Sequence, residues 1–232
     1  MPIKRFFKNM MAKVKTHYAS QCQLVRKIIN GQYLTSGQAP TWLMRIVMLI
    51  LMLARCTSLG QILQGCSREE KQNDVIDLYV VAAFVTLVGL LFWIPKSWVA
   101  FVAAIYLMIE MFMVTLGVIF VDRHQPKHQI RSPERSIVLL ALGYLELIIG
   151  FAILYLSYSC IEFSSNNKLV SSSWDALYFS TATITTLGFG DIRPTSQSGR
   201  ILVIFETLVG IMLIVYALSI FILSSRAFKA DG

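Results

Sequence analysis

Seven consecutive residues, Thr185 to Asp191, read TTLGFGD and place two glycines at alternating positions. Glycine adopts backbone angles that other L-residues resist. At such angles the carbonyl groups of successive residues can face a common axis, where they replace the water shell of a cation. Gly188 and Gly190 therefore predict a non-helical stretch whose carbonyl oxygens are ligands for an ion.

A short, moderately apolar and threonine-rich segment, residues 173–186, comes directly before these glycines. It is too short to cross a hydrocarbon core of about 30 Å as a helix, so we expect a re-entrant helix. Ser172 and Asp175 have the spacing of a capping box, which predicts that the helix begins there. Its far end then directs carbonyl groups and the negative end of the helix dipole toward the cation.

The composition is typical of a polytopic helical membrane protein. Of the 232 residues, 56% are hydrophobic and 15% are charged, and the mean hydropathy is +0.62. These values lie far from the balance of a water-soluble domain. We expect an all-α integral membrane protein with about four transmembrane helices, at residues 76–94, 98–121, 136–158 and 199–228.

Basic residues dominate the N-terminal region. Residues 1–30 contain seven lysines and arginines and no acid, and the formal net charge of the chain is +8. In so hydrophobic a chain this surplus favours positive-inside topology and anionic lipids over nucleic acid. Residues 1–75 are predicted to be cytoplasmic, with a membrane-lying amphipathic helix at about 41–63, because the apolar core between Arg45 and Arg55 is only half a membrane long.

The remaining breaks in the apolar pattern predict the orientation. Pro95 and Lys96 leave only a tight turn, which makes residues 76–121 a helical hairpin, and the basic break at 122–135 belongs on the cytoplasmic side. Both termini are then cytoplasmic in a multi-pass protein of the plasma or inner cell membrane. No helix repeats arginine or lysine at every third position, so a voltage sensor is not expected.

From Ser171 the sequence reads SSSWDALYFSTATITTLGFGDIRPTSQSGR, which resembles the pore region of the potassium-channel superfamily, closest to the two-helix pore module of bacterial channels. The match is good over residues 174–210 and weak over the preceding helix. It implies a pore domain at residues 136–228, composed of outer helix, pore helix, filter and inner helix, and K⁺ as the permeant ion with no other cofactor. One filter segment per chain cannot enclose an ion, so the resemblance implies a homotetramer.

The resemblance assigns the filter residue by residue. Two of these residues depart from the commonest pattern, since Leu187 stands where valine is usual and Phe189 where tyrosine is usual. Without the tyrosine hydroxyl, apolar packing is expected to anchor the filter, which would be less rigid and inactivate more readily. The predicted ion ligands are Thr186, Leu187, Gly188, Phe189 and Gly190, with Thr185, Asp191, Tyr178 and Phe179 as filter support.

The gating candidates lie mainly in the last helix. Gly210 falls on the position of a gating hinge in the family, although close helix packing explains a glycine there equally well. Leu218 and Phe221 are expected to narrow the cytoplasmic end of a cavity lined by Ile211 and Ile214. Three acids lie within predicted spans, where an ionisable side chain is a functional candidate; Glu206 is the nearest to Gly210, and Glu110 and Glu146 are the others.

Two other functions stay open. A non-selective cation channel is the nearest, although such channels in this superfamily usually lack the intact glycine-aromatic-glycine pattern. A non-conducting regulatory partner that keeps the pore fold for assembly is the other. No nucleophile stands beside a partner base, so we do not expect an enzyme.

Overall fold

The computed structural model describes residues 42, 46, 72–120 and 133–230. The chain divides into two compact units, considered separately: residues 1–79 with 109–131, and residues 80–108 with 132–232. The predicted cytoplasmic region at 1–75, with its amphipathic helix at 41–63, lies almost entirely outside the described residues. Most of the basic break at 122–135 also lies outside them, and both stay predictions.

Within the described residues, a long helix occupies each of the four apolar segments. The helices begin and end within about one turn of the predicted bounds. The turn at residues 94–97 joins the first two, and there the Ser97 amide donates a hydrogen bond to the Ile94 carbonyl at 3.0 Å. The four helices are α4 (Gln72–Trp93), α5 (Trp98–Phe120), α6 (Pro133–Tyr158) and α8 (Gln197–Ala230).

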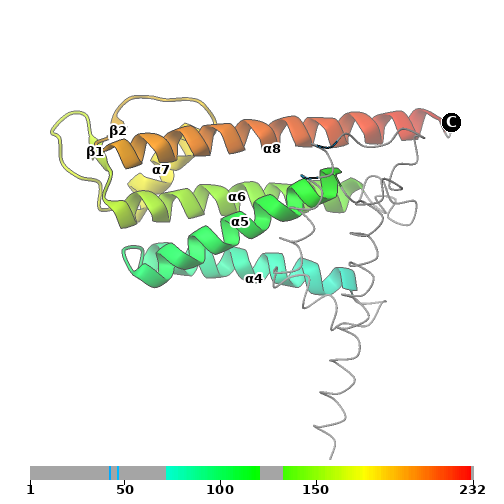
Figure 1. Cartoon of the computed structure of the whole chain (residues 1–232), viewed down its shortest axis with the longest axis horizontal. Coiled ribbons are helices and arrows are strands. Elements are labelled where there is room, and N and C mark those ends of the chain that lie inside the picture. The colour runs from blue at the N-terminus through cyan, green and yellow to red at the C-terminus, as the bar shows by residue number, and fades with distance from the viewer. Residues whose placement is uncertain (1–41, 43–45, 47–71, 121–132, 231–232) are drawn as a thin grey trace, which may run out of the picture. The chain divides into compact units, whose positions relative to one another are not determined.

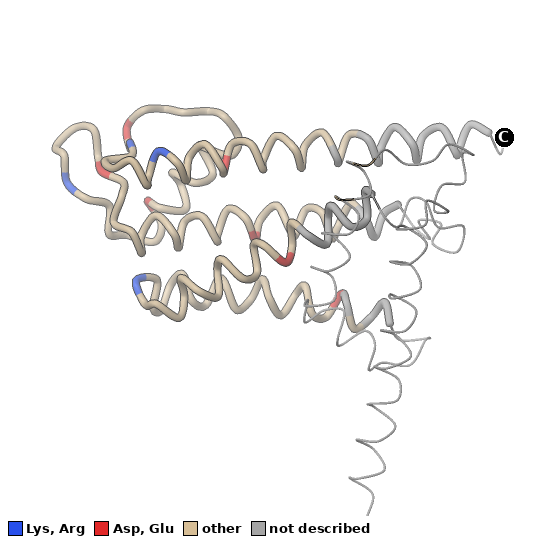
Figure 2. Tube along the Cα trace, in the orientation of Figure 1, with Lys and Arg blue, Asp and Glu red and all other residues tan. Residues whose placement is uncertain are grey.

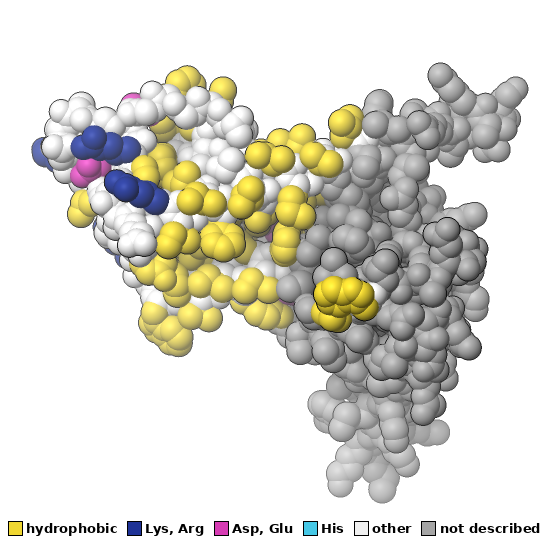
Figure 3. All heavy atoms as spheres, turned by 45° about the horizontal axis from the view of Figure 1, so that its top comes forward, with side chains coloured by type: hydrophobic (Ala, Val, Ile, Leu, Met, Phe, Trp, Pro, Cys, Tyr) yellow, Lys and Arg dark blue, Asp and Glu magenta, His cyan; other side chains and the backbone are white. Residues whose placement is uncertain are grey.

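Two of the described helices are long and apolar enough to cross a membrane, through Ile137–Tyr158 of α6 and Gln197–Val215 of α8. The apolar stretches found in α4 and α5, Asp77–Trp93 and Trp98–Phe112, are shorter. Hydrophobic side chains cover the described flank of the helices in Figure 3, whereas the lysines and arginines gather near one end. In Figure 2 the lysines and arginines of the described residues likewise lie near one end of the trace. Membrane crossing by α4 and α5 stays a prediction.

Between α6 and α8 the chain forms a short helix and two short strands. The helix α7 (Ser173–Ile184) packs against both α6 and α8 (Figure 1). The strands β1 (Ile161–Phe163) and β2 (Ile192–Pro194) pair antiparallel, with Glu162 opposite Arg193. This pairing joins the segment after α6 to the segment before α8.

The helix α7 begins where the sequence predicts, but the predicted capping box is wrong. Ser172 is the N-cap residue, with extended backbone angles (φ −81°, ψ 134°), yet its side chain makes no cap hydrogen bond. The spacing of Ser172 and Asp175 does not determine which way the serine hydroxyl turns. Asp175 does lie in the first turn, where its negative charge interacts favourably with the helix dipole.

The helix α6 lies at the centre of the second unit. Its residues Ile153, Tyr155 and Leu156 are fully buried, with 0% of their surface exposed. They belong to one apolar cluster that also contains Phe179 of α7 and Leu213 of α8. The short helix and the last helix are therefore both held against α6.

Candidate functional site

The backbone after α7 alternates in handedness. Thr186, Gly188 and Gly190 have positive φ angles of 61°, 56° and 80°, whereas Leu187 and Phe189 between them do not. The two glycines thus have the unusual backbone angles that the sequence predicts. A Cβ added at either glycine would meet no atom within 4 Å, so backbone conformation, and not space within the chain, is what demands glycine there.

This alternation has a direct chemical consequence. Successive residues of alternating handedness form an arrangement called a nest, in which their amide groups point to one side of the chain. The carbonyl groups then point to the other side. A row of carbonyl oxygens on one side is the ligand arrangement that replaces the water shell of a potassium ion. Residues 185–191 are all exposed in the single chain.

Thr186 is left-handed because it closes the C-terminus of α7. The Leu187 amide donates to the Ala182 carbonyl at 2.8 Å, and the Thr186 amide donates to the Thr183 carbonyl at 3.0 Å. These are the two bonds of a Schellman motif, in which the residue after the C-cap adopts the left-handed conformation. The sequence gives no signal for it, because glycine is the usual residue at this position.

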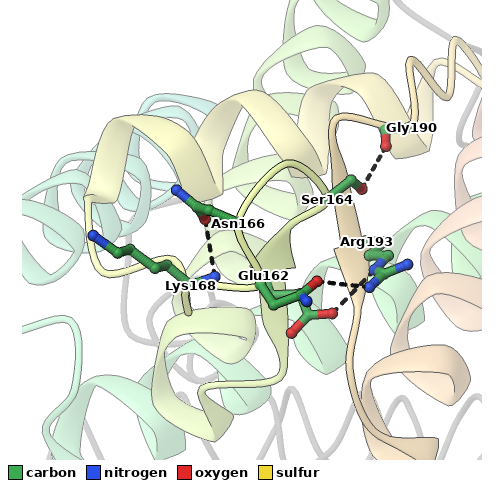
Figure 4. Close-up of polar contacts among 7 residues, drawn as sticks. Glu162, Ser164, Asn166, Lys168, Gly190 and Arg193 are labelled. Atoms are coloured by element: carbon green, nitrogen blue, oxygen red, sulfur yellow. Dashed lines mark hydrogen bonds and ion pairs between the residues drawn. The ribbon is translucent and has the colours of Figure 1, made fainter.

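Ser164, in the loop after β1, forms hydrogen bonds at the C-terminal end of this row of carbonyl groups. Its hydroxyl donates to the Gly190 carbonyl at 2.6 Å (Figure 4), and its amide donates to the Asp191 carbonyl at 2.8 Å. Gly190 therefore differs from the other predicted ligands, since its carbonyl already accepts a hydrogen bond. Sequence reasoning missed Ser164, because no spacing relates it to the glycines.

Arg193 of β2 links the two strands next to Gly190 and Asp191. Its Nε atom lies 3.0 Å from Oε1 of Glu162, and its guanidinium also donates to Oδ1 of Asn167 at 2.9 Å. The Arg193 side chain is 54% exposed, so this ion pair adds little stability by itself. It does keep β1 and β2 in register beside residues 190 and 191 (Figure 4).

Tyr178 of α7 contacts the segment that carries the row of carbonyl groups. Its ring stacks on Phe189, with centroids 6.1 Å apart and planes 7° apart, as the expectation of apolar packing implies. The Asp191 carboxylate also interacts with the Tyr178 hydroxyl and raises the pKa of that hydroxyl. The aromatic anchor therefore includes a polar contact that the sequence did not predict.

The other predicted support residues are placed differently. Phe179 is buried and packs edge-on against Tyr155 of α6, with centroids 4.9 Å apart, so within one chain it packs α7 against α6. The hydroxyl of Thr185 donates to the Thr181 carbonyl of its own helix at 2.6 Å. Leu187 and Phe189 are 61% and 65% exposed in the single chain.

Glu206 of α8 connects three helices. It is fully buried; Oε2 accepts a hydrogen bond from the Tyr155 hydroxyl of α6 at 2.6 Å, and Oε1 accepts one from the Ser180 hydroxyl of α7. Ser180 also lies 2.8 Å from the Ile148 carbonyl of α6. Sequence reasoning singled out Glu206 but neither hydroxyl partner.

Gly210 lies one turn further along α8, directly against the end of α7. A Cβ built there would lie 2.5 Å from Cγ1 of Ile184 and 3.1 Å from its carbonyl oxygen. Only a residue without a side chain allows this approach. The structure therefore gives Gly210 a packing role, and its role as a gating hinge stays a prediction.

The remaining candidates are less closely tied to this site. Leu218, Ile211 and Ile214 are all about half exposed in the single chain, and the side chain of Phe221 lies outside the described ones. Glu110, in the other unit, accepts a hydrogen bond from Tyr79, which fits a strut between helices. Glu146 is buried within α6.

The part of the chain that contains this geometry is similar to known proteins. Residues 143–224 match the family model described as "Ion channel". The chain is 42% identical over 45 residues to the hyperpolarization-activated voltage-gated potassium channel of Methanocaldococcus jannaschii. This match covers 19% of the chain and 22% of that channel. The chain is 33% identical over 132 residues to human potassium channel subfamily K member 10, which covers 51% of this chain and 24% of the relative. The mouse protein of the same name is 29% identical to the chain over 130 residues.

These matches cover only parts of the chain. No solved structure matches it significantly, and the chain spans less than a quarter of the length of these curated relatives. Residues 143–224, which run from within α6 to within α8, are therefore similar to ion channels, and parts of the chain are distantly similar to potassium channels. The match to an ion-channel family model bears out the expectation that the chain is not an enzyme.

Proposed function

We propose that the chain is one subunit of a homotetrameric channel that conducts K⁺ selectively and passively across a cell membrane. The observation that carries this proposal is the alternating handedness of residues 186–190 directly after the pore helix. It supports the carbonyls of Thr186, Leu187, Gly188 and Phe189, with the Thr186 hydroxyl, as K⁺ ligands, and Gly190 as the outer mouth.

The proposed tetramer follows from the incompleteness of one chain. A single row of carbonyls surrounds no ion, whereas closed rotational symmetry turns each carbonyl into a ring. The single chain also leaves apolar side chains of α8 exposed. They include Ile204, Phe205, Leu208 and Met212, and neighbouring copies are the proposed cover.

The pore helix contributes electrostatics to the proposed site. Its last residue, Ile184, comes directly before Thr185 and two residues before Thr186. The last carbonyls of a helix carry a partial negative charge of roughly half an electron. Four such ends directed at the centre of a tetramer would favour a cation there.

We place both termini on the cytoplasmic side, because four crossings return the chain to the side where it began and the basic residues at 1–30 favour the inside. The filter then opens outward. Anionic lipids are the proposed partners of the basic N-terminal region.

The decisive experiment measures ion flux through liposomes that contain only the purified protein. With K⁺ on one side and Na⁺ on the other, we expect a reversal potential close to the equilibrium potential of K⁺. A reversal potential near zero would favour a non-selective cation channel. An absence of K⁺ flux under every condition would favour a non-conducting partner. Chemical cross-linking that saturates at four subunits tests the assembly.

The substitution Phe189→Tyr is expected to slow inactivation. A tyrosine hydroxyl adds a polar anchor to the ring that now only stacks on Tyr178, and one hydrogen bond changes an equilibrium by about fivefold. Tyr178→Phe removes the hydroxyl that interacts with Asp191 and is expected to accelerate inactivation. The check is the decay of K⁺ current after activation, and unchanged decay in both variants would refute the anchoring role.

The hydrogen bonds of Glu206 predict a difference between two substitutions of similar size. Glu206→Leu leaves the buried Tyr155 hydroxyl without its acceptor, at a cost of about 1–3 kcal/mol per subunit. Glu206→Gln keeps an oxygen for Tyr155 and an amide group for Ser180. We expect the leucine variant to lower the temperature of tetramer dissociation far more than the glutamine variant. Equal losses would show that shape matters there and hydrogen bonding does not.

A further inference from the structure

The helical hairpin of α4 and α5 meets the pore domain beside the start of the pore helix. We propose that this hairpin positions the pore helix: Ser173, the first residue of α7, is a positioning residue held by α4, and α4 thereby biases the state of the filter. The inference rests on the proposed channel function.

The anchor begins with a carbonyl that its own helix leaves unsatisfied. In a continuing helix, the Leu91 carbonyl would accept a hydrogen bond from the amide of residue 95. Residue 95 is proline, which has no amide hydrogen. The Ser173 hydroxyl donates to the Leu91 carbonyl instead, at 2.7 Å. Pro95 thus both ends α4 and frees the acceptor that α7 uses.

Aromatic side chains next to these two residues reinforce the anchor. Phe92 follows Leu91, Trp174 follows Ser173, and their ring centroids lie 4.9 Å apart, a distance at which aromatic pairs attract. We use the name hairpin anchor for these four residues: Leu91, Phe92, Ser173 and Trp174.

The end of α6 holds the same turn from a second side. The Ser157 hydroxyl donates to the Pro95 carbonyl at 3.0 Å. Tyr158 packs edge-on against Phe101 of α5, with centroids 5.3 Å apart. The hairpin turn is therefore fixed to the outer helix as well as to the pore helix.

Close packing behind the anchor makes the hairpin a part of the pore domain. Leu87, Leu91, Ala100 and Ala104 are fully buried and share one cluster with the core residues of α6. Ala100 and Ala104 are one turn apart on α5, and small residues at this spacing let membrane helices approach closely. Figure 1 shows the turn between α4 and α5 at the same end of the unit as α7.

The pore helix can carry a displacement from the anchor to the filter. It has 12 residues, about 18 Å of helix at 1.5 Å per residue. Its first residue is in the hairpin anchor, and its last turn is bonded to Thr186 and Leu187. A shift of the first residue therefore tilts the segment to which the filter backbone is attached.

The test compares two neighbouring serines in the reconstituted full chain. Ser173→Ala removes the bond to Leu91, whereas Ser172→Ala removes a hydroxyl that makes no cap hydrogen bond. We expect Ser173→Ala to change the Rb⁺ to K⁺ permeability ratio or the inactivation rate about fivefold. Ser172→Ala and the hydroxyl-preserving Ser173→Thr are expected to match the wild type. A merely structural role would lower the amount of tetramer and leave both readouts unchanged.

The outcomes separate the two proposals. A conducting, K⁺-selective wild type with Ser173→Ala indistinguishable from Ser172→Ala overturns the positioning role alone. A wild type that passes no K⁺ overturns the proposed function, and this inference with it. If Ser173→Ala does not assemble, Phe92→Leu decides, because it removes only the ring contact with Trp174: a shift in the same readouts supports the positioning role, and no shift overturns it.

Discussion

The substitution Gly188→Ala is expected to abolish K⁺-selective flux. Gly188 has a φ of 56°, in a region that costs an L-residue with a side chain roughly 1–2 kcal/mol. In a symmetric tetramer the cost would apply four times, or roughly 4–8 kcal/mol. Alanine would therefore force the backbone out of the alternating conformation. The measurement is K⁺ flux from liposomes, with an expected loss of more than about a hundredfold.

A second glycine provides the matched control. Gly89 lies within α4, where an added Cβ would meet only the Trp93 ring at an ordinary 3.4 Å. Alanine favours a helix over glycine by about 1 kcal/mol, so Gly89→Ala is expected to leave conduction intact. A Gly188→Ala channel that keeps both its flux and its K⁺ selectivity would refute the assigned role of the alternating backbone.

The substitution Gly210→Ala is expected to reduce both conduction and stability. The new methyl group would lie 2.5 Å from Cγ1 of Ile184, so α8 must move away from the end of the pore helix. Overpacking of this kind costs about 1–3 kcal/mol per site. We expect a lower temperature of tetramer dissociation, together with a fall in K⁺ flux of at least about tenfold.

Two further variants distinguish packing from a hinge. In Gly150→Ala the nearest atom is Sδ of Met108, also at 2.5 Å, but a methionine side chain is flexible and can move aside. That variant is expected to be mild. Ile184→Ala removes the clashing atom and is expected to recover part of the stability lost in Gly210→Ala. Loss of flux with unchanged stability in Gly210→Ala, and no recovery in the double variant, would favour the hinge.

The local features of the site were predictable from the sequence, because local physics determines them. A long apolar run forms a helix wherever it is placed, and the short helix does begin at Ser173 as expected. The glycines at 188 and 190 do adopt the positive φ angles that their residue type suggests. Each of these inferences needed only neighbouring residues.

The features that the sequence did not predict depend on contacts between distant residues. Ser164 reaches Gly190 across 26 residues, Tyr155 reaches Glu206 across 51, and Ser173 reaches Leu91 across 82. A serine hydroxyl takes whichever acceptor the packed helices bring near, and its spacing from other residues does not record that choice. The close approach of Gly210 depends in the same way on where Ile184 points.

Thr186 occupies its left-handed position against its own preference. Glycine there would close the pore helix with less strain, since a β-branched residue at positive φ is a genuine outlier. Glycine, however, would remove the hydroxyl that we propose as an ion ligand. Stability and conduction thus favour different residues at the same position. A search for more stable variants of this protein would tend to select Thr186→Gly, and the most robust tetramer it found would be a poorer conductor.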